Sequence, residues 1–263
     1  MMIVPRRSNE RGNIDYGWLK TFHTFSFGSY QYSGHESFGS LRAINENRVS
    51  AHTGFGVHSH SNFEVLRYVV SGELQHNDSL GTTRILKRGD VQLTSAGTGV
   101  YHSETAQNGD VHLLEIWSSQ ALSTLAPSHF IRHFSDEEKL NGWVRIAAPV
   151  NASYVYSDQD DGGSAPIRSA MVIYATCLAS GLFNQRSFQL GSSMGYIHVI
   201  QTSGYNVGTA GGAKVKLSGG DSGITEVELR EGDGAYMMFV SGKKIKVQNI
   251  GAGIAEVLLF EID

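Results

Sequence analysis

The feature that most constrains the fold of this chain is a succession of short apolar runs, each ended by a turn signal. Between Phe63 and Trp117 these runs are about four to eight residues long, and Gly, Asn or Asp separates them at intervals of roughly 8 to 12 residues. The chain holds 31 Gly and only 4 Pro, which suits frequent tight turns. This pattern predicts an all-β protein of antiparallel strands in a sandwich or barrel. The clearest helix signal is a capping box, in which Ser135 precedes Glu138 by three residues.

Composition excludes several classes of protein. Lys and Arg number 21 against 25 Asp and Glu, and this net charge of −4 argues against a protein that binds nucleic acid directly. A single cysteine, Cys177, allows no internal disulfide and fits a reducing compartment. The first residues lack the apolar core of a signal peptide, and no apolar run is long enough to span a bilayer. We therefore expect a cytoplasmic monomer without membrane contact, with access to the nucleus left open if the source is eukaryotic.

Three segments of the first half recur in the same order in the second half. The pairs are Val65–Gly72 with Tyr196–Gly204, Arg88–Asp90 with Glu231–Asp233, and Leu113–Ile116 with Leu259–Ile262. The preserved order favours a duplication over chance similarity between short strands. The sequence thus predicts two tandem β domains, residues 1–134 and residues 135–263. Because the offset between the copies grows along the chain, we expect an insertion in the second copy, at Tyr205–Gly223.

Two short motifs in the first half carry the residue types of a metal site. His58 and His60 are two residues apart, and so are His102 and Glu104. Side chains alternate along a strand, so each pair projects from one face, and two such strands side by side would present three imidazoles and one carboxylate. A single H-x-H is more often a surface or packing pair, but two such motifs in one β domain favour a metal. Imidazole and carboxylate suit Fe, Mn, Cu, Ni or Zn, and sets with open positions are typical of Fe(II) oxygenases. We expect one metal per chain.

The spacing around these motifs matches that of the two cupin motifs. The first contains the H-x-H pair, then Glu64 and Gly72, and the second has the form G-x-G-x-x-H over Gly97–His102. Within the cupins, the chain resembles the pirin family. The residues that carry the resemblance are Asn9–Gly12, Tyr16–Leu19, His23–Phe27, Gly54–His60, Phe63-Glu64, Gly72–Gly81 and Ala96–Glu104. The second half matches weakly, chiefly at Gly232–Gly234 and Glu256–Phe260.

This resemblance implies a bicupin fold of two tandem antiparallel jelly-roll barrels with few short helices. It also implies one metal, usually iron, in the N-terminal cupin. The positions that match the ligands of the family are His58, His60, His102 and Glu104. Several bacterial and eukaryotic members have quercetin 2,3-dioxygenase activity, and a mammalian member is a nuclear transcription cofactor.

The chain departs from the family pattern at a few positions. Ser59 stands where the family usually has Pro, and Ser61-Asn62 stand where it usually has Arg-Gly. The ligand types are intact, so the metal site is still expected, while the loss of an Arg near it changes the local charge. In the second half, Gln185 and Arg186 stand where ligands would be needed. We expect that cupin-like domain to be metal-free.

The leading hypothesis is an Fe(II)-dependent dioxygenase that opens a flavonol such as quercetin with O2. Glu104 would take the proton of the substrate hydroxyl, in addition to its role as a ligand. Candidate pocket residues are Phe55, Phe63, Glu64 and His23. Glu64 is also an alternative carboxylate ligand, and His23 could instead be a packing residue in an aromatic run.

Two other kinds of protein share the same ligand set. The main alternative is a metal- or redox-sensing regulatory protein that acts through a protein partner and has no turnover. A structural cupin without activity is the other. Cupin folds host many reactions, so the fold leaves the substrate open, and relative affinities leave open Cu, Ni, Mn or Zn in place of Fe.

Overall fold

The computed structural model describes residues 1–119, 124–158, 162–188, 192–208, 211–219, 225–239 and 242–262. Strands dominate these residues, with one short α-helix, α1 (Asp136–Lys139), and one 3-10 helix, η1 (Ser8–Glu10). The all-β prediction is confirmed. The capping box is present too, because Ser135 Oγ accepts a hydrogen bond from Glu138 N at 3.1 Å and Glu138 Oε2 accepts one from Ser135 N at 2.7 Å. No helix in the described part of the chain is long and apolar enough to cross a membrane.

The chain divides by its internal contacts into two compact units. The first unit comprises Gly12–Phe134 and Ala147–Ala170, and the second comprises Met1–Arg11, Ser135–Ile146 and Met171–Asp263. Neither is a continuous stretch, because β1 (Met2–Arg6) pairs with a strand of the second unit. The division into domains 1–134 and 135–263 stays a prediction about which segments fold independently.

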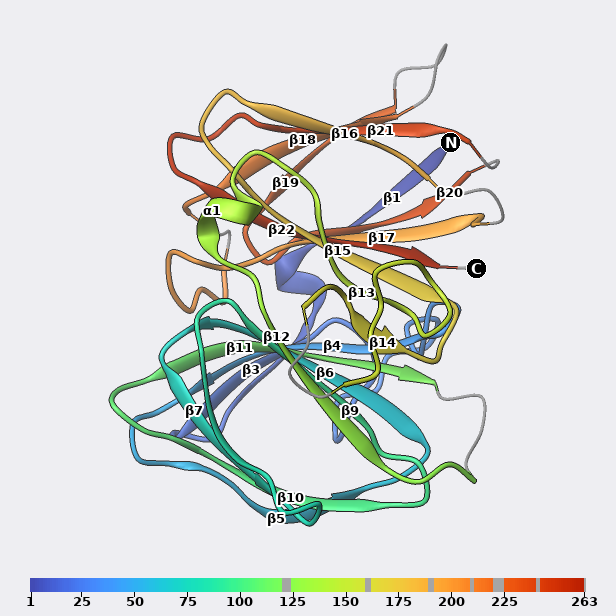
Figure 1. Cartoon of the computed structure of the whole chain (residues 1–263). Helices are drawn as coiled ribbons and strands as arrows, with labels where there is room; N and C mark the ends of the chain where they lie inside the picture. The colour runs from blue at the N-terminus through green and yellow to red at the C-terminus, as the bar shows by residue number, and fades with distance from the viewer. Residues whose placement is uncertain are drawn as a thin grey trace. The chain divides into compact units, whose positions relative to one another are not determined.

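The first unit is built of two antiparallel sheets (Figure 1). The larger sheet has the order β12-β9-β6-β11-β4-β3-β2, and the smaller has the order β5-β10-β7-β8. The strands of the larger sheet are β2 (Gly12–Asp15), β3 (Leu19–His23), β4 (Leu41–Val49), β6 (Phe63–Ser71), β9 (Asp90–Ser95), β11 (Val111–Ser119) and β12 (Ser128–His133). Those of the smaller sheet are β5 (Gly54–His60), β7 (Glu73–Asp78), β8 (Thr83–Lys87) and β10 (Val100–Ala106).

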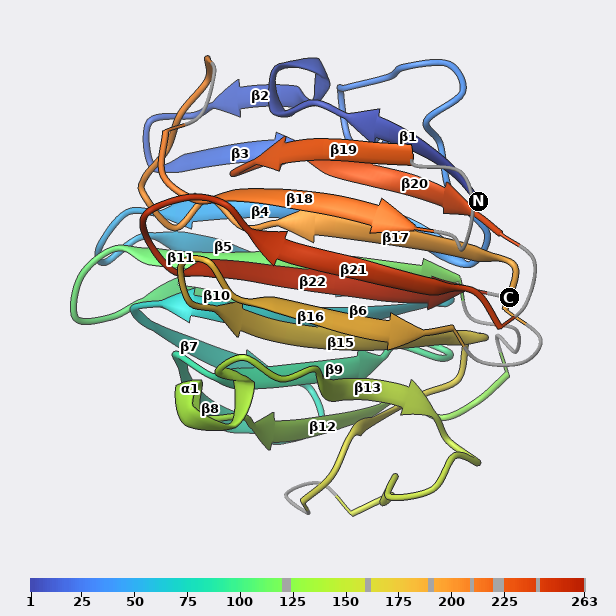
Figure 2. The same cartoon turned by 90° about the horizontal axis from the view of Figure 1, so that it is seen from above.

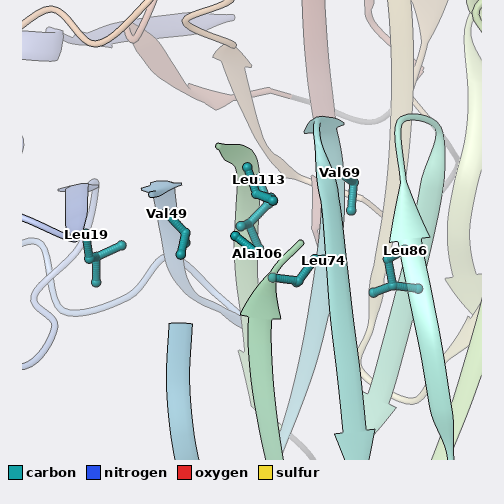
Figure 3. Packing of buried hydrophobic residues seen from close by; sticks show 8 residues of the cluster. Leu19, Val49, Val69, Leu74, Leu86, Ala106 and Leu113 are labelled. Atoms are coloured by element: carbon teal, nitrogen blue, oxygen red, sulfur yellow. The ribbon is translucent and has the colours of Figure 1, made fainter. Parts of the chain in front are cut away.

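An apolar cluster joins the two sheets of the first unit at one end of their strands (Figure 3). The larger sheet contributes side chains from four strands and the smaller sheet from three. The labelled members are Leu19, Val49, Val69, Leu113, Leu74, Leu86 and Ala106, each no more than 7% exposed. Burial of such side chains stabilises the packing by roughly 1.5–3 kcal/mol each. The inner face between the sheets is therefore closed by apolar packing at this end, and its polar residues lie farther along the same strands.

The second unit repeats this arrangement. Its larger sheet contains the order β1-β20-β17-β22-β15, and its smaller sheet has the order β16-β21-β18-β19. Figure 2 shows β20, β17, β22 and β15 side by side. The further strands are β15 (Met171–Leu178), β16 (Phe183–Ser187), β17 (Met194–Val199), β18 (Lys214–Gly219), β19 (Thr225–Arg230), β20 (Gly234–Met238), β21 (Lys244–Asn249) and β22 (Ala255–Ile262). β13 (Val144–Pro149) begins in this unit and ends in the first, where it pairs with β14 (Ala165–Ile167) in parallel.

The strand orders agree with an internal duplication. The three recurring sequence segments fall on equivalent elements, namely β6 and β17, the turns that lead into β9 and β20, and β11 and β22. The longer connection of the second copy is also visible. Gly72 alone joins β6 to β7, whereas residues 200–213 join β17 to β18. The insertion expected at Tyr205–Gly223 overlaps this connection, and residues 209–210 and 220–223 lie outside the described part of the chain.

Candidate metal centre

The pairing of β5 with β10 brings the two sequence motifs together. In this antiparallel pair His58 lies opposite His102, and His60 lies opposite Val100. The Nε2 atom of His102 is 2.8 Å from that of His58 and 2.9 Å from that of His60. Three ring nitrogens aimed at one point cannot all satisfy one another, because a neutral imidazole nitrogen either donates or accepts a single hydrogen bond. A cation held between them would satisfy all three, so this donor set fits a metal.

A β-bulge shapes the strand that carries the first pair. The register shifts between His102 and Glu104, so that Glu104 lies opposite Phe55. The extra residue of β5 places Phe55 at the edge of a cavity while Val57 is 77% exposed. The carbonyl oxygen of Gly56 accepts a hydrogen bond from His58 Nδ1 at 2.7 Å. This bond fixes the tautomer of His58 and leaves its Nε2 as the nitrogen with a free electron pair.

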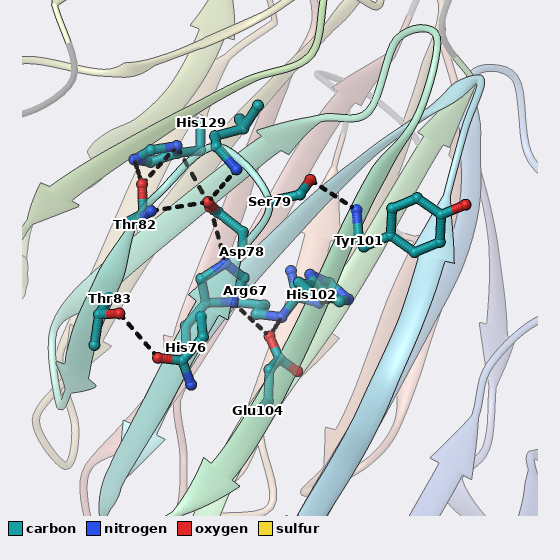
Figure 4. A network of polar contacts seen from close by, with 12 residues as sticks. Arg67, His76, Asp78, Ser79, Thr82, Thr83, Tyr101, His102, Glu104 and His129 are labelled. Carbon is teal, nitrogen blue, oxygen red and sulfur yellow. Dashed lines mark hydrogen bonds and ion pairs between the residues drawn. The ribbon is translucent and has the colours of Figure 1, made fainter.

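Glu104 has a different immediate environment from the three histidines. Its Oε1 atom forms an ion pair with Arg67 Nε, which reaches across from β6, and lies 3.2 Å from His76 Nδ1 (Figure 4). Burial alone would raise the pKa of Glu104, but the Arg67 guanidinium and the hydrogen bond with His76 lower it to about 2. The candidate ligand atoms therefore fall in two overlapping groups that share His102, one with His58 and His60 and one with His76 and Glu104.

Two of the histidines are held neutral by their surroundings. Burial, followed by the nearby charge of Arg67, lowers the pKa of His60 to about 4 and that of His102 to about 2. At neutral pH both rings thus keep an electron pair for a metal. The Nδ1 atom of His102 is buried and, within the described residues, has no hydrogen-bond partner.

A further chain of polar residues leads away from Glu104 and was missed from the sequence. His76 Nε2 lies 3.3 Å from Asp78 Oδ2, and Asp78 Oδ2 lies 3.6 Å from His129 Nδ1. His129 Nε2 lies 3.0 Å from Thr82 Oγ1 (Figure 4). The sequence does not single out His76 or His129, because neither stands in an H-x-H pair. The spacing of His76 and Asp78, two residues apart on one strand, was the signal that could have revealed this network.

An aromatic cavity of about 320 Å³ lies between the sheets of the first unit, and Phe55 on its wall links it to His58. Two of the expected pocket residues, Phe55 and His23, line it. The Phe55 ring also lies against that of His58, with 6.2 Å between the ring centroids. The other lining residues are Ile14, Tyr16, Trp18, Leu19, Thr21, Phe27, Gly28, Ser29, Asn45, Asn47 and Glu115.

The remaining two expected pocket residues lie elsewhere. Phe63 lines a separate cavity of about 160 Å³ together with Trp117, whose ring packs edge-on against His60 at 4.9 Å. The carboxylate of Glu64, also expected as an alternative ligand, is buried among four donors of the first unit. They are Ser95 Oγ, Ser118 Oγ, Arg168 N and Ser169 N, at 2.8 to 3.3 Å. These donors occupy its acceptor positions, so the hydrogen-bonding capacity of the Glu64 carboxylate is used by the chain itself.

The corresponding strand of the second unit presents other side chains. On β16 the half-buried residues are Asn184 and Arg186, whereas Gln185 is exposed. Arg186 Nε donates to Glu261 Oε1 at 2.7 Å, and its other nitrogen Nη2 contacts the Tyr174 hydroxyl. The expectation that Gln185 stands at a ligand position is therefore wrong by one residue, because Asn184 shares the inner face with Arg186.

Comparisons with known proteins agree with this geometry. Residues 5–118 match the family model described as Pirin. A quercetin 2,3-dioxygenase of Escherichia coli strain K12 is 39% identical over 135 residues, which are 51% of this chain and 58% of that protein, so the match spans less than two thirds of its length. A putative quercetin 2,3-dioxygenase of Zymomonas mobilis is 32% identical over 251 residues, which are 93% of this chain and 100% of that protein. The crystal structure of bacterial pirin YhhW from Escherichia coli in complex with nickel(II) superposes with a TM-score of 0.80 at 27% identity, over 99% of both chains.

Proposed function

The chain belongs to the pirin family, and from this premise we propose that it is a metal-dependent oxidoreductase that opens a flavonol such as quercetin with O2. The observation that carries the proposal is the convergence of three imidazole Nε2 atoms, together with an aromatic cavity of about 320 Å³ whose wall residue Phe55 lies against His58. Ligand pockets of proteins usually measure about 300–1,000 Å³, so a compact aromatic substrate suits this one. The names of the curated relatives support the same reaction class.

The residues that would hold the metal are His58, His60, His102 and Glu104. The first three offer converging ring nitrogens, and Glu104 adds a carboxylate whose low pKa keeps it ionised. When bound, the metal would supply Lewis acidity toward a substrate oxygen and a redox-active ion for the reaction with O2. We propose Fe(II) as that metal. The nickel(II) complex of YhhW makes nickel a direct competitor, and metal analysis of the native protein decides between them.

The chain's own residues bind and shield the substrate. Trp18 and Phe55 pack edge to face at 5.2 Å on the cavity wall, where they can hold an aromatic ring and exclude water. The proton-acceptor role expected of Glu104 stays a prediction. The Arg67 ion pair that lowers its pKa makes this carboxylate a weak base and a good ligand.

The test is aerobic turnover of quercetin by the iron-loaded protein, followed by the flavonol absorbance, O2 uptake and release of carbon monoxide. We expect wild type to lose the flavonol absorbance and His102→Gln to keep it, because this substitution removes the imidazole that both ligand groups share. His133→Gln is the matched control, because His133 is half-exposed and bonds Asp90 at 2.7 Å. If fully metal-loaded wild-type protein leaves quercetin intact, the proposal of enzymatic activity on quercetin is wrong.

A regulatory role without turnover is the second candidate. It is favoured by two exposed apolar side chains on the strands that carry the histidines, Val57 at 77% and Tyr101 at 60% exposure. Neighbouring side chains of a strand point to opposite faces, so a partner bound over Tyr101 would contact the strand that presents His102. Capture experiments with the iron-loaded protein in its oxidised and reduced forms test this role. Identical partners in both states would count against a redox sensor.

A further inference from the structure

A row of buried polar side chains crosses the inner face of the larger sheet of the first unit. Arg67 of β6 is paired with Glu115 of β11, Glu115 with Asn45 of β4, and Asn45 with His23 of β3. Directly paired residues of neighbouring strands share one face of a sheet. All four are buried, at 1%, 9%, 2% and 6% exposure in that order. One end of the row, Arg67, contacts the metal centre, and the other end lines the aromatic cavity.

Glu115 occupies the middle of this row and is the one carboxylate among the residues that line the cavity. Trp117 Nε1 donates a hydrogen bond to its Oε1 atom, and Asn47 Nδ2 lies 3.5 Å from its Oε2 atom. A carboxylate has about four acceptor positions, so these two donors leave capacity for a ligand hydroxyl. The neighbouring amides are engaged with the chain: Asn45 Oδ1 with His23 Nδ1 at 2.7 Å, and Asn47 Oδ1 with Thr21 Oγ1 at 2.6 Å.

We propose that Glu115 is a catalytic residue that accepts the proton of a phenolic hydroxyl on an aromatic substrate in this cavity. The inference rests on the proposed function and adds a residue to it. In this step the substrate O–H bond breaks, the proton forms a bond to an oxygen of the Glu115 carboxylate, and the electron pair stays on the substrate oxygen. The negative charge passes from Glu115 to the substrate, and the total charge of the pair is unchanged. The ligand class is a hydroxylated aromatic, whose ring the aromatic walls hold and whose hydroxyl points to Glu115.

The electrostatic surroundings suit Glu115 better than Glu104 for this task. Burial raises the pKa of Glu115, and the nearby charge of Glu104 adds to that rise, against the lowering effects of Arg67, the Trp117 hydrogen bond and His58. Glu104 instead forms a direct ion pair with Arg67 Nε and accepts a hydrogen bond from His76, so its carboxylate is already engaged. A base of higher pKa takes a phenolic proton more readily. The two buried carboxylates thus divide into a ligand beside the arginine and a proton acceptor on the cavity wall.

The experiment compares full-length, iron-loaded wild type with Glu115→Gln and Glu115→Asp. Metal content, kcat and KM for quercetin are measured in air, and the absorption spectrum of bound quercetin is recorded without O2. Glu46→Gln is the matched control. Glu46 is a buried glutamate of β4 at 2% exposure, next to Asn45 in sequence and so on the opposite face, where it accepts a hydrogen bond from His112 Nε2 at 3.0 Å.

We expect Glu115→Gln to keep its iron, to lose about 10²–10⁴-fold in kcat as for the loss of a general base, and to change KM much less. Bound quercetin should show the red-shifted band of its deprotonated form in wild type and the protonated band in Glu115→Gln. Glu115→Asp should restore part of both readouts, and Glu46→Gln should behave as wild type.

Wild-type kcat and spectrum in Glu115→Gln would overturn the inference and leave the proposed function standing. Loss of iron in Glu115→Gln would also overturn the inference, because Glu115 would then support the metal centre. Iron-loaded wild type that binds quercetin without turnover would contradict the proposed function, while the spectra still decide the proton transfer. Wild type that neither binds nor converts quercetin would overturn both.

Discussion

The two units share one strand order and differ in what fills the space between their sheets. In the first unit β5 and β10 contribute His58, His60 and His102 to the inner face. At the equivalent place in the second unit β16 contributes Asn184 and Arg186, and β21 contributes Ile245 and Val247, both at most 1% exposed. The shared topology therefore supplies the scaffold, and the side chains on two strands decide whether a metal can bind.

Each unit also holds an arginine–glutamate pair between its sheets, with the partners exchanged. In the first unit the arginine, Arg67, comes from the larger sheet and Glu104 from the smaller. In the second, Arg186 comes from the smaller sheet and Glu261 from the larger. Because Arg186 itself lies where a ligand would be needed, its ion pair fills the interior. Arg67 approaches from the larger sheet, where its Nη2 atom lies 3.3 Å from His102 Nε2, and the three imidazoles still face one another. Which sheet supplies the arginine of the buried ion pair therefore decides whether that side chain occupies the position of a ligand.

The difference between the two units predicts that substitutions at the candidate ligands have their largest effect on metal binding. His58→Gln and His102→Gln should each abolish tight metal binding, measured by elemental analysis after dialysis against free metal. The converse variant, Asn184→His with Arg186→His, installs an H-x-H pair on β16. We expect it to bind no second metal, because the facing residues Ile245 and Val247 offer no ligand atom. A second bound metal ion in that variant would contradict the claim that the side chains of both strands decide whether a metal binds.

The next largest effect concerns the two ion pairs. Arg67→Met leaves the buried Glu104 without its arginine and with His76 alone as a partner, and we expect it to lower the free energy of unfolding by about 3–5 kcal/mol in urea denaturation of the metal-free protein. Arg186→Met should cost less, because the Arg186 side chain is 25% exposed and water can solvate part of the site, whereas that of Arg67 is 1% exposed. Equal losses in the two variants would show that the pairs are equivalent and that their direction does not matter.

The smallest effect concerns the β-bulge between β5 and β10, because the equivalent pair β16 and β21 has a regular register. A Cβ atom added at Gly54 would lie 1.9 Å from the carbonyl oxygen of Glu104, whereas one at Gly56 would meet nothing within 4 Å. We expect Gly54→Ala to separate β5 from β10 and to weaken metal binding by about tenfold, the low end of what altered ligand support costs. Gly56→Ala should bind as wild type. Titration of both variants checks this, and equal affinities would show that the close approach at Gly54 does not position the histidines.

Local sequence patterns were sufficient for several features of the site. The period of two along a strand correctly placed His58 and His60 on one face, and the same spacing singled out His102 and Glu104 as the second motif, which the resemblance to the pirins then matched to ligand positions. The same reasoning failed at Gln185, because a shift of one residue moves every side chain of a strand to the other face. The residues that neighbour Gln185 in the sequence carry no signal of such a shift.

The sequence by itself thus determined an all-β chain, its duplication and the strand faces that carry the candidate ligands, because these follow from short-range periodicity and spacing. Only the tertiary structure decided which residues meet across the two sheets. It paired Arg67 with Glu104, gave Glu64 four donors of its own and placed Glu115 on the cavity wall. The physical reason is that these contacts depend on strand register and on the packing of one sheet against the other, which join residues far apart in the chain.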